Sequence, residues 1–310
     1  MVWRQTVFAL GLQVVASTAL LGLGGYLVID RQLTLGQLVA AELIVALVVA
    51  SVAKLGKYAE AYYDLLGASE KLGLVTDLPL EREGGEALAD VQRGMAVRVH
   101  GVDCVSHRTL STPNDWSVAP GERVAVVGPP GSGKTTLFEM LCGLREPGHG
   151  VVELDGIDLR ELSLEQMREQ VALLEGVDIF TGTVAENVRV GRWQLSPSEV
   201  RDALQLVGLT ETVHDLPNGL DTPLVPGGGP LSSSQALRLT LARALVGHPR
   251  LLILDGVLDA LDMRECPHLL PRLFDRSAEW TLLVVSNNPA VVGMCDRTIE
   301  LAPFARPEAE

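Results

Sequence analysis

The chain begins with two long apolar stretches that polar residues hardly interrupt. Residues 7–29 read VFALGLQVVASTALLGLGGYLVI, and residues 35–53 read LGQLVAAELIVALVVASVA. Each is close to the roughly 20 apolar residues that a helix needs to cross the hydrocarbon core of a bilayer. The first is too long for the apolar region of a signal peptide, and the second follows at once. The pattern predicts two transmembrane helices joined by the short loop DRQLT.

The charges that flank these stretches predict the orientation of the hairpin. Arg4 precedes the first stretch and Lys54 and Lys57 follow the second, whereas Asp30 and Arg31 in the loop cancel. Because Lys and Arg are in excess on the cytoplasmic side of membrane helices, both ends of the hairpin are expected in the cytoplasm. A pair of buried helices in a soluble core is the alternative interpretation.

Glu42 is the ionisable residue within the two stretches. An ionisable side chain inside a membrane is by default a candidate functional site, because its charge is costly there. The alternative is that Glu42 packs against further helices, including those of a partner. We favour packing over transport chemistry at this residue.

Beyond the second stretch, apolar residues recur at helical spacing as far as residue 72 and extend the helix out of the membrane. The segment DLPLEREGGE, residues 77–86, is rich in Pro, Gly and Glu and is typical of a linker. Short apolar runs then alternate with helical patterns, which favours an α/β domain with a largely parallel sheet. The predicted organisation is a partial transmembrane domain (1–76), a linker (77–90), an α/β domain (91–303) and a tail (304–310).

Charge and cysteine content restrict the classes of partner. The chain carries 25 Lys and Arg against 39 Asp and Glu, and nearly all of this acidic excess falls after residue 80. Nucleic acid is therefore not an expected partner, because phosphate backbones bind clustered Lys and Arg. The four cysteines include no C-x-x-C pair, which is typical of reduced thiols in a cytosolic domain.

Residues 128–135 read GPPGSGKT and match the pattern G-x-x-x-x-G-K-[ST]. The match follows the strand pattern RVAVV and precedes a helical pattern, which is the context that this phosphate-binding loop requires. Gly131 and Gly133 allow the backbone N–H groups and the helix N-terminus to face phosphates. Lys134 is expected to reach the β and γ oxygens of a nucleotide, and Thr135 to bind Mg²⁺. The predicted nucleotide-binding residues of this segment are Gly128, Pro129, Pro130, Gly131, Ser132, Gly133, Lys134, Thr135 and Thr136.

Two further segments extend the predicted site. Residues 251–254 are apolar and predict a strand buried on both faces, and Asp255 ends this strand as a second anchor for Mg²⁺. Residues 231–245 read LSSSQALRLTLARAL and place a Ser-rich turn before a helix, whose positive N-terminal end suits an anion.

Taken in order, these segments resemble the nucleotide-binding domain of the ABC transporter family. The resemblance rests on GPPGSGKT, on the signature LSSSQ followed by LARAL, on LLILD and on the loop Ala260-Leu261-Asp262. Residues 180–187 are similar to an exporter-type segment, and the apolar hairpin is similar to the last two of six transmembrane helices of an exporter half-transporter. The implied fold is an α/β P-loop NTPase domain preceded by a two-helix transmembrane hairpin. The implied ligands are ATP, bound also by Ser232 and Gln235, and Mg²⁺, bound by Thr135, Asp255 and Glu175.

The chain departs from the family pattern at its catalytic positions. Gly256 stands where the family has its catalytic glutamate, and Asn287 stands at the switch histidine. Counting back from Phe180, Glu175 stands where the family has its Q-loop glutamine, and adds negative charge beside the γ-phosphate. Ser233 and Ser234 replace two signature glycines, whose backbones would approach the phosphate closely. The resemblance therefore implies a site without an intact catalytic residue.

Two residues are candidates to compensate for these departures. His107 offers a ring near the position of the adenine-stacking aromatic residue, although a lone histidine in a polar loop is more often merely solvated. Asp259, three residues after Gly256, is a candidate base, but a surface or capping role is favoured. Because a missing general base commonly lowers a rate by about 10²- to 10⁴-fold, MgATP is expected to bind and to be hydrolysed poorly.

The favoured hypothesis is a subunit of an ABC exporter, a multi-pass protein of the inner or plasma membrane with its nucleotide-binding domain in the cytoplasm. Domains of this family dimerise head to tail, so the expected partners are a second ABC subunit and membrane lipid. A heterodimer is favoured, because a homodimer would pair two incomplete sites; the cargo is not indicated. The alternatives are a non-catalytic ATP-binding regulatory protein or a decayed transporter fragment. A soluble ABC-type repair or translation ATPase is disfavoured by the apolar stretches.

Overall fold

The computed structural model describes residues 2–78, 80–89, 91–103, 115–262 and 264–301. His107 and the predicted tail at 304–310 lie outside these residues. The chain divides into two compact units, Met1–Glu81 and Arg82–Glu310. The boundary between the units falls inside the segment that the sequence predicts to be a linker.

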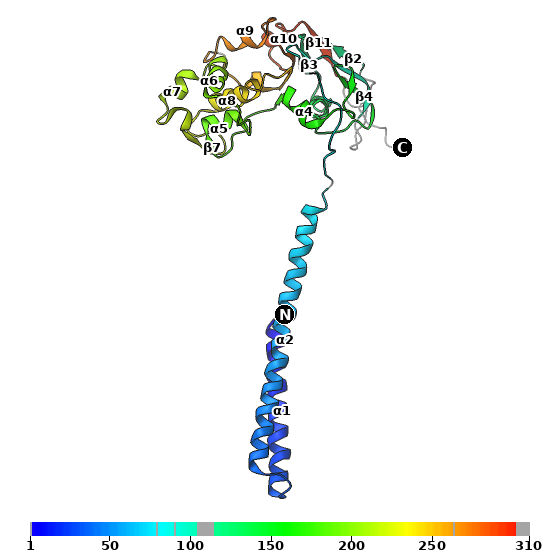
Figure 1. Ribbon diagram of the computed structural model, residues 1–310, viewed down its shortest axis with the longest axis vertical. Coiled ribbons are helices and arrows are strands. Elements are labelled where there is room, and N and C mark those ends of the chain that lie inside the picture. Colours follow the sequence, from blue (N-terminus) through cyan, green and yellow to red (C-terminus); the bar gives the residue numbers. More distant parts are fainter. Residues whose placement is uncertain (1, 79, 90, 104–114, 263, 302–310) are drawn as a thin grey trace. The chain divides into compact units, whose positions relative to one another are not determined.

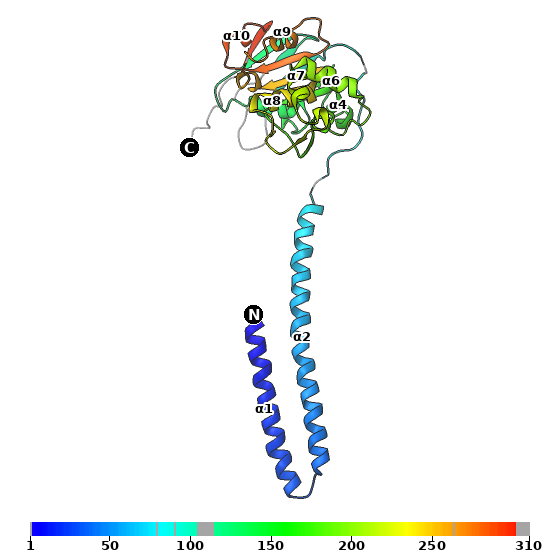
Figure 2. The ribbon, with the colours of Figure 1, turned by 90° about the vertical axis from the view of Figure 1, so that its left-hand side faces the viewer.

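Unit 1 is a hairpin of two antiparallel helices, α1 (Val2–Ile29) and α2 (Leu35–Thr76) (Figure 2). Thr34 begins α2 with a capping box, in which its side chain accepts from the backbone of Gln37 and the Gln37 side chain accepts from the backbone of Thr34. At about 1.5 Å per residue, the 42 residues of α2 extend over about 63 Å. The helix therefore continues well past the predicted apolar stretch, as its sequence pattern indicates.

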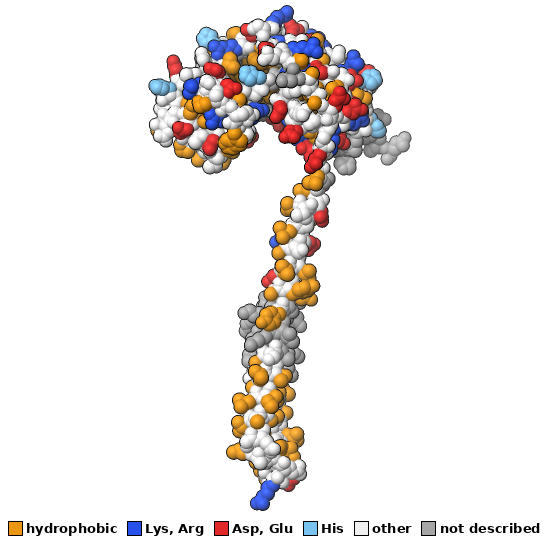
Figure 3. All heavy atoms as spheres, viewed as in Figure 1, with side chains coloured by type: hydrophobic (Ala, Val, Ile, Leu, Met, Phe, Trp, Pro, Cys, Tyr) orange, Lys and Arg blue, Asp and Glu red, His pale blue; other side chains and the backbone are white. Residues whose placement is uncertain are grey.

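Large apolar side chains are exposed along both helices of unit 1 (Figure 3). They include Val14, Val15, Leu21, Leu23, Tyr26 and Ile29 on α1, and Leu35, Val39, Leu43, Ile44, Leu47 and Val48 on α2. Among the described residues, neither helix holds a stretch that is long and apolar enough to cross a membrane. The structure thus contains the predicted hairpin but does not confirm that its helices are membrane spans.

Glu42 lies where α1 and α2 pack together. Its Oε1 accepts a hydrogen bond of 2.7 Å from Ser17 Oγ, whereas Oε2 is buried without a partner in the described part of the chain. Nearby, a Cβ added to Gly24 would lie 2.3 Å from Leu38 Cδ1, so the helices approach closely there. Within the hairpin, Glu42 thus contacts α1 through Ser17.

Unit 2 is built on a five-stranded parallel sheet of order β11-β3-β10-β9-β6. Its strands are β3 (Arg123–Val127), β6 (Val171–Leu174), β9 (Leu251–Asp255), β10 (Thr281–Val285) and β11 (Arg297–Glu300). Side chains of β9 alternate between two hydrophobic cores, with Leu252 and Leu254 in one core and Leu251 and Ile253 in the other. All four are fully buried, as predicted for a parallel strand that is covered on both faces.

A second sheet of unit 2 is antiparallel and has the order β2-β1-β4-β5. Its strands are β1 (Val97–Asp103), β2 (Trp116–Val118), β4 (His149–Leu154) and β5 (Ile157–Asp158). The predicted largely parallel sheet therefore describes only the central sheet. Antiparallel strands need no crossover helix between them, so this sheet lacks the strand-helix alternation on which the prediction rested.

Helices surround the central sheet. They are α3 (Lys134–Leu141), α4 (Leu164–Gln170), α5 (Val184–Arg189), α6 (Pro197–Leu206), α7 (Thr210–Asp215), α8 (Ser233–Leu245), α9 (Leu269–Leu273) and α10 (Pro289–Val292). Short turns η1 (Gly219–Asp221) and η2 (Val257–Asp259) and the paired β7 (Gly182–Thr183) and β8 (Pro223–Leu224) complete the unit. Within unit 2, α5 to α8 and the antiparallel sheet lie at opposite ends (Figure 1).

Candidate nucleotide-binding site

The candidate site lies where the parallel strands of unit 2 end. Gly128 follows β3, Glu175 follows β6, Asp255 ends β9 and Asn287 follows β10 closely. Because these strands are parallel neighbours, their carboxyl ends meet at one edge of the sheet, where ligands of open α/β sheets bind. Four predicted residues from distant parts of the sequence are therefore brought to the same edge.

The segment between β3 and α3 has the backbone that a phosphate-binding loop requires. Gly128, Gly131 and Gly133 have φ values of 158°, 80° and 91°, and Gly133 begins α3 without a side-chain cap. A Cβ at Gly128 would lie 2.6 Å from the carbonyl oxygen of Leu301, so only glycine fits there. The uncapped N–H groups at the start of α3 are available to an anion.

Lys134 closes this loop with its side chain. Its Nζ donates to the carbonyl oxygens of Gly128 at 2.8 Å and of Pro129 at 3.1 Å, and lies 3.3 Å from Ser132 Oγ. Ser132 is buried, whereas Lys134 is only partly covered. The ammonium group is thus held over the loop, at the position from which it can donate to phosphate oxygens.

Thr135 and Asp255 meet across the site. Thr135 Oγ1 donates to Asp255 Oδ2 over 2.7 Å, although the residues are 120 positions apart. A hydroxyl and a carboxylate at this distance are oxygen donors of the kind that Mg²⁺ prefers, with phosphates and water supplying its other ligands. No group of three or more His, Cys, Asp or Glu residues suited to a metal occurs among the described residues. The donor set therefore fits an Mg²⁺ ion that arrives with a nucleotide.

Glu175 is the third predicted Mg²⁺ ligand. Burial raises the pKa of its carboxyl group, and the negative charges of Asp255 and Glu139 raise it further. The pKa of the Cys142 thiol is raised to about 12, mainly by burial and secondly by the negative charge of Glu175. Glu175 thus lies close enough to Asp255 for repulsion, which a divalent cation would relieve.

Glu175→Gln is expected to change how the melting temperature of the protein depends on pH. Because the raised pKa disfavours ionised Glu175 in the folded protein, this group lowers stability as the pH rises through its titration range. The variant should therefore raise the melting temperature without nucleotide near neutral pH and leave it unchanged in acid. The exposed Glu211→Gln is the matched control for melting curves recorded across this range. An unchanged curve for Glu175→Gln would contradict the assigned environment.

Gly256 follows Asp255 directly and Asn287 follows β10, and neither offers a base. Gly256 has φ of 68°, and a Cβ added to it would have no neighbour within 4 Å. The Asn287 N–H donates to Asp259 Oδ2 at 2.8 Å, and Ser286 Oγ donates to Asp259 Oδ1. Both carboxylate oxygens of Asp259 therefore hold the loop after β10, which agrees with a capping role. The bond to Ser286 has no signal in the sequence.

The predicted signature residues lie at the start of α8. Ser232 caps this helix by accepting from the Gln235 N–H at 3.2 Å, and Gln235 Oε1 accepts from the Ser232 N–H at 2.8 Å. Ser234 Oγ donates to Glu265 Oε2 at 3.1 Å. Within the described residues, no hydrogen bond joins Ser232 or Gln235 to the phosphate-binding loop. These contacts build the helix end but do not bring it into the site of the same chain.

A polar cluster fixes the segment that follows Glu175. Asn187 accepts from the Phe180 N–H at 3.1 Å and donates to the Phe180 carbonyl at 3.0 Å. Arg243 of α8 donates to the Asn187 carbonyl at 2.7 Å, pairs with Asp178 at 3.1 Å and lies 5.5 Å from the Phe180 ring centroid. The sequence singled out residues 180–187, but gave no signal for the part played by Arg243.

This fold and site define an α/β P-loop nucleotide-binding domain. Residues 112–258 match the family described as ABC transporter. The chain is 32% identical over 240 residues to an ATP-dependent lipid A-core flippase of Thiobacillus denitrificans, covering 76% of this chain and 42% of that protein. It is 31% identical over 301 residues to a multidrug efflux ATP-binding/permease protein of Mycobacterium bovis, covering 96% and 25%. Unit 2 therefore carries a domain of the ABC transporter family.

A solved structure extends this likeness. The chain matches the structure of a bacterial Atm1-family ABC exporter with ATP bound, with a TM-score of 0.74 and 25% sequence identity over 87% of this chain and 48% of that one. The chain spans less than half the length of the curated relatives described above. By name, the relatives are a flippase and an efflux ATP-binding/permease protein, and the structural neighbour is an ABC exporter.

Proposed function

We propose that this protein is the MgATP-binding subunit of an exporter-type ABC transporter, and that it hydrolyses ATP poorly. The observation that carries the proposal is the contact of Thr135 with Asp255 beside the phosphate-binding loop. It supports a place for Mg²⁺ next to the loop closed by Lys134. The glycine conformations turn the loop N–H groups toward a phosphate. Lys134 supplies the cation and Thr135 the metal ligand that a nucleoside triphosphate needs.

Impaired hydrolysis is supported by what stands around Asp255. Gly256 has no side chain that could take a proton from water, and Asn287 replaces an ionisable ring. Asp259 is engaged through both oxygens with Ser286 and Asn287, so it is a poor substitute base. The proposed site binds MgATP and lacks the group that general-base catalysis requires.

A second ABC subunit is the proposed partner. The signature residues Ser232 and Gln235 make local contacts only, which leaves the exposed end of α8 available to a nucleotide held by another chain. We favour a heterodimer, because a partner with a general base would supply the catalysis that Gly256 does not. The division into a hairpin domain (1–76), a linker (77–90) and a nucleotide-binding domain (91–303) is part of the same proposal.

The direct test of the proposed function is titration of the purified chain with ATP in the presence and absence of Mg²⁺. We expect saturable binding that weakens when Mg²⁺ is removed by chelation. Phosphate release should remain near background throughout the titration. Failure to bind ATP at any Mg²⁺ concentration would overturn the proposal.

The hairpin of unit 1 is proposed to lie in a membrane with both of its ends in the cytoplasm. Apolar side chains exposed along α1 and α2 support this location, because water-exposed apolar surface of this extent is unusual in a soluble protein. We expect the full chain to sediment with membranes and to resist extraction at alkaline pH. An engineered Leu33→Cys should react with a membrane-impermeant thiol reagent only from outside the cell. Labelling only from the cytoplasmic side would contradict the hairpin topology.

A further inference from the structure

The segment that follows the hairpin in the chain is fastened to unit 2. We call residues 82–95 the strap; residue 90 lies outside the described residues. The Glu86 N–H donates to the carbonyl of Glu161 at 2.6 Å, and the Ser163 N–H donates to the carbonyl of Glu86 at 2.9 Å. Leu88 is only 5% exposed. The strap, which includes residues 82–89 of the proposed linker, is therefore docked on unit 2.

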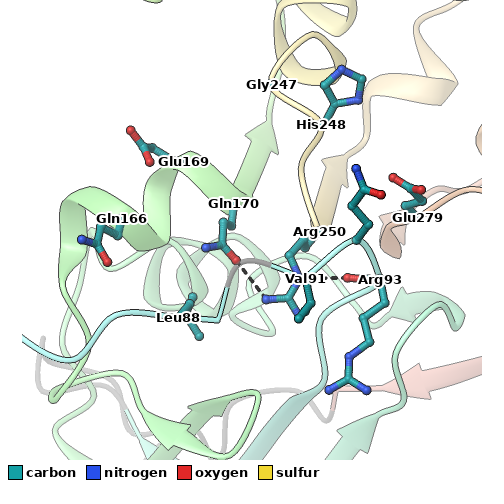
Figure 4. A pocket seen from close by; sticks show the side chains of 11 residues that line it. Leu88, Val91, Arg93, Gln166, Glu169, Gln170, Gly247, His248, Arg250 and Glu279 are labelled. Carbon is teal, nitrogen blue, oxygen red and sulfur yellow. Dashed lines mark hydrogen bonds between the residues drawn. The ribbon is translucent and has the colours of Figure 1, made fainter.

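Arg250 contacts the strap with its side chain (Figure 4), and Arg82 of the strap donates to the carbonyls of Leu159 and Arg160. The Nε of Arg250 donates to the carbonyl of Arg93 at 2.8 Å, and one terminal nitrogen donates to the carbonyl of Ala89 at 3.1 Å and to Gln170 Oε1 at 2.9 Å. The other terminal nitrogen pairs with Asp155. Asp155 in turn accepts from the Ala96 N–H at 2.8 Å. One side chain thus ties the strap at two points to the body of unit 2.

Arg250 is buried, so its contacts are costly to lose. The Arg250 side chain is 6% exposed and that of Asp155 is 14% exposed. Removing one member of such a pair leaves an uncompensated charge away from water, and is much more costly than losing a surface pair. Lysine at this position could keep the charge but has no planar fork with which to reach several acceptors at once.

The backbone of Arg250 lies at the start of two strands that lead to the candidate site. Its carbonyl accepts from the Met95 N–H at 3.0 Å and from the Thr281 N–H at 2.9 Å. Leu251, the next residue, begins β9, whose last residue is Asp255. Thr281 begins β10, which leads to the loop of Asn287. The strap is therefore joined to the starting ends of the strands whose other ends form the nucleotide site.

A cavity of about 610 Å³ lies beside this contact and is lined by Leu88 and Val91 of the strap and by Gln170 and Arg250. Figure 4 shows the Gln170 and Arg250 side chains meeting next to the strap. The pocket is partly open to solvent, so the strap is not close-packed on this side. The strap thus has its anchor at Arg250 beside a space that the described residues do not fill.

We propose that Arg250 is a positioning residue that couples the strap to the nucleotide site: it makes the strap move with the starting ends of β9 and β10, so that MgATP bound at their other ends alters the strap. The proposal rests on the proposed function, because it requires MgATP to bind. It assigns Arg250 no contact with the nucleotide. The coupling runs through two rigid strands rather than through a chain of mobile side chains.

Hydrogen exchange of the strap amides, measured on the full chain by mass spectrometry with and without MgATP, tests the coupling. In the wild type we expect MgATP to slow exchange of the strap. Arg250→Gln should speed strap exchange about tenfold or more without nucleotide, as loss of a buried hydrogen-bonded partner implies. The decisive expectation is that this variant binds MgATP while its strap no longer responds. Arg250→Lys should restore part of the response, and the control Arg272→Gln, which removes an exposed arginine bonded to the Gln205 carbonyl, should retain all of it.

The outcomes separate the coupling from the proposed function. The proposal is overturned if MgATP slows strap exchange in Arg250→Gln as much as in the wild type. It is also overturned if bound MgATP leaves strap exchange of the wild type unchanged. If the wild type does not bind MgATP, the proposed function fails in the titration itself, and the coupling falls with it. If Arg250→Gln does not fold, Gln170→Leu removes a single contact of Arg250, and its strap response must then be smaller than that of the wild type.

Discussion

Lys134→Ala is expected to weaken MgATP binding by roughly 10- to 100-fold, because a charge-assisted hydrogen bond contributes about 1.5–3 kcal/mol. The variant removes the ammonium group that closes the loop over the Gly128 and Pro129 carbonyls. Isothermal titration with ATP and Mg²⁺ measures the loss directly.

The control for this variant is Lys71→Ala, which removes an exposed lysine from α2. It should bind MgATP as tightly as the wild type. Melting curves without nucleotide separate binding from folding, and Lys134→Ala should change them little because its side chain is only partly covered. Equal affinities of Lys134→Ala and the wild type would show that the loop does not hold the nucleotide.

The phosphate-binding loop could be predicted from the sequence because its chemistry is local. Gly131, Gly133, Lys134 and Thr135 lie within a few residues, and a strand pattern and a helix pattern fix their context. Asp255 could be added because a fully apolar strand must end at the same edge of a parallel sheet. The structure places Thr135 and Asp255 in contact, as these two signals together predict.

Contacts between distant loops carried no such signal. The bonds from Asp259 to Ser286 and to the Asn287 backbone depend on how two loops meet at the sheet edge. Neither sequence spacing nor residue type specifies that meeting. The same holds for Arg250. In the sequence nothing distinguishes this residue before a strand, whereas in the structure it contacts segments up to 161 positions away. The antiparallel sheet was missed because the strand-helix alternation that identified the central sheet is absent from its strands.

The last expected result concerns restoration of catalysis. Gly256→Glu alone should raise ATP turnover little, because the resemblance implies that the base acts together with a histidine where this chain has Asn287. Gly256 itself has φ of 68°. A residue with a side chain is strained there by about 1 kcal/mol or more. The space around its Cβ is open within 4 Å, so the glutamate adds this modest backbone strain but no clash. Asp259 holds the N–H of residue 287 in every variant, so the loop after β10 keeps its present position.

Gly256→Glu combined with Asn287→His should exceed either single variant by about 10²-fold or more, since catalytic groups that act as a unit recover together. The glutamate would supply a base beside Asp255, and the exposed position of Asn287 accommodates a histidine ring. Steady-state phosphate release by the purified wild type, both single variants and the double variant measures this, with Lys134→Ala in each background to subtract contaminating hydrolysis. Substantial hydrolysis by the wild type alone that Lys134→Ala abolishes would contradict the impaired site. It would direct attention to Glu175, whose raised pKa suits a group that takes up a proton.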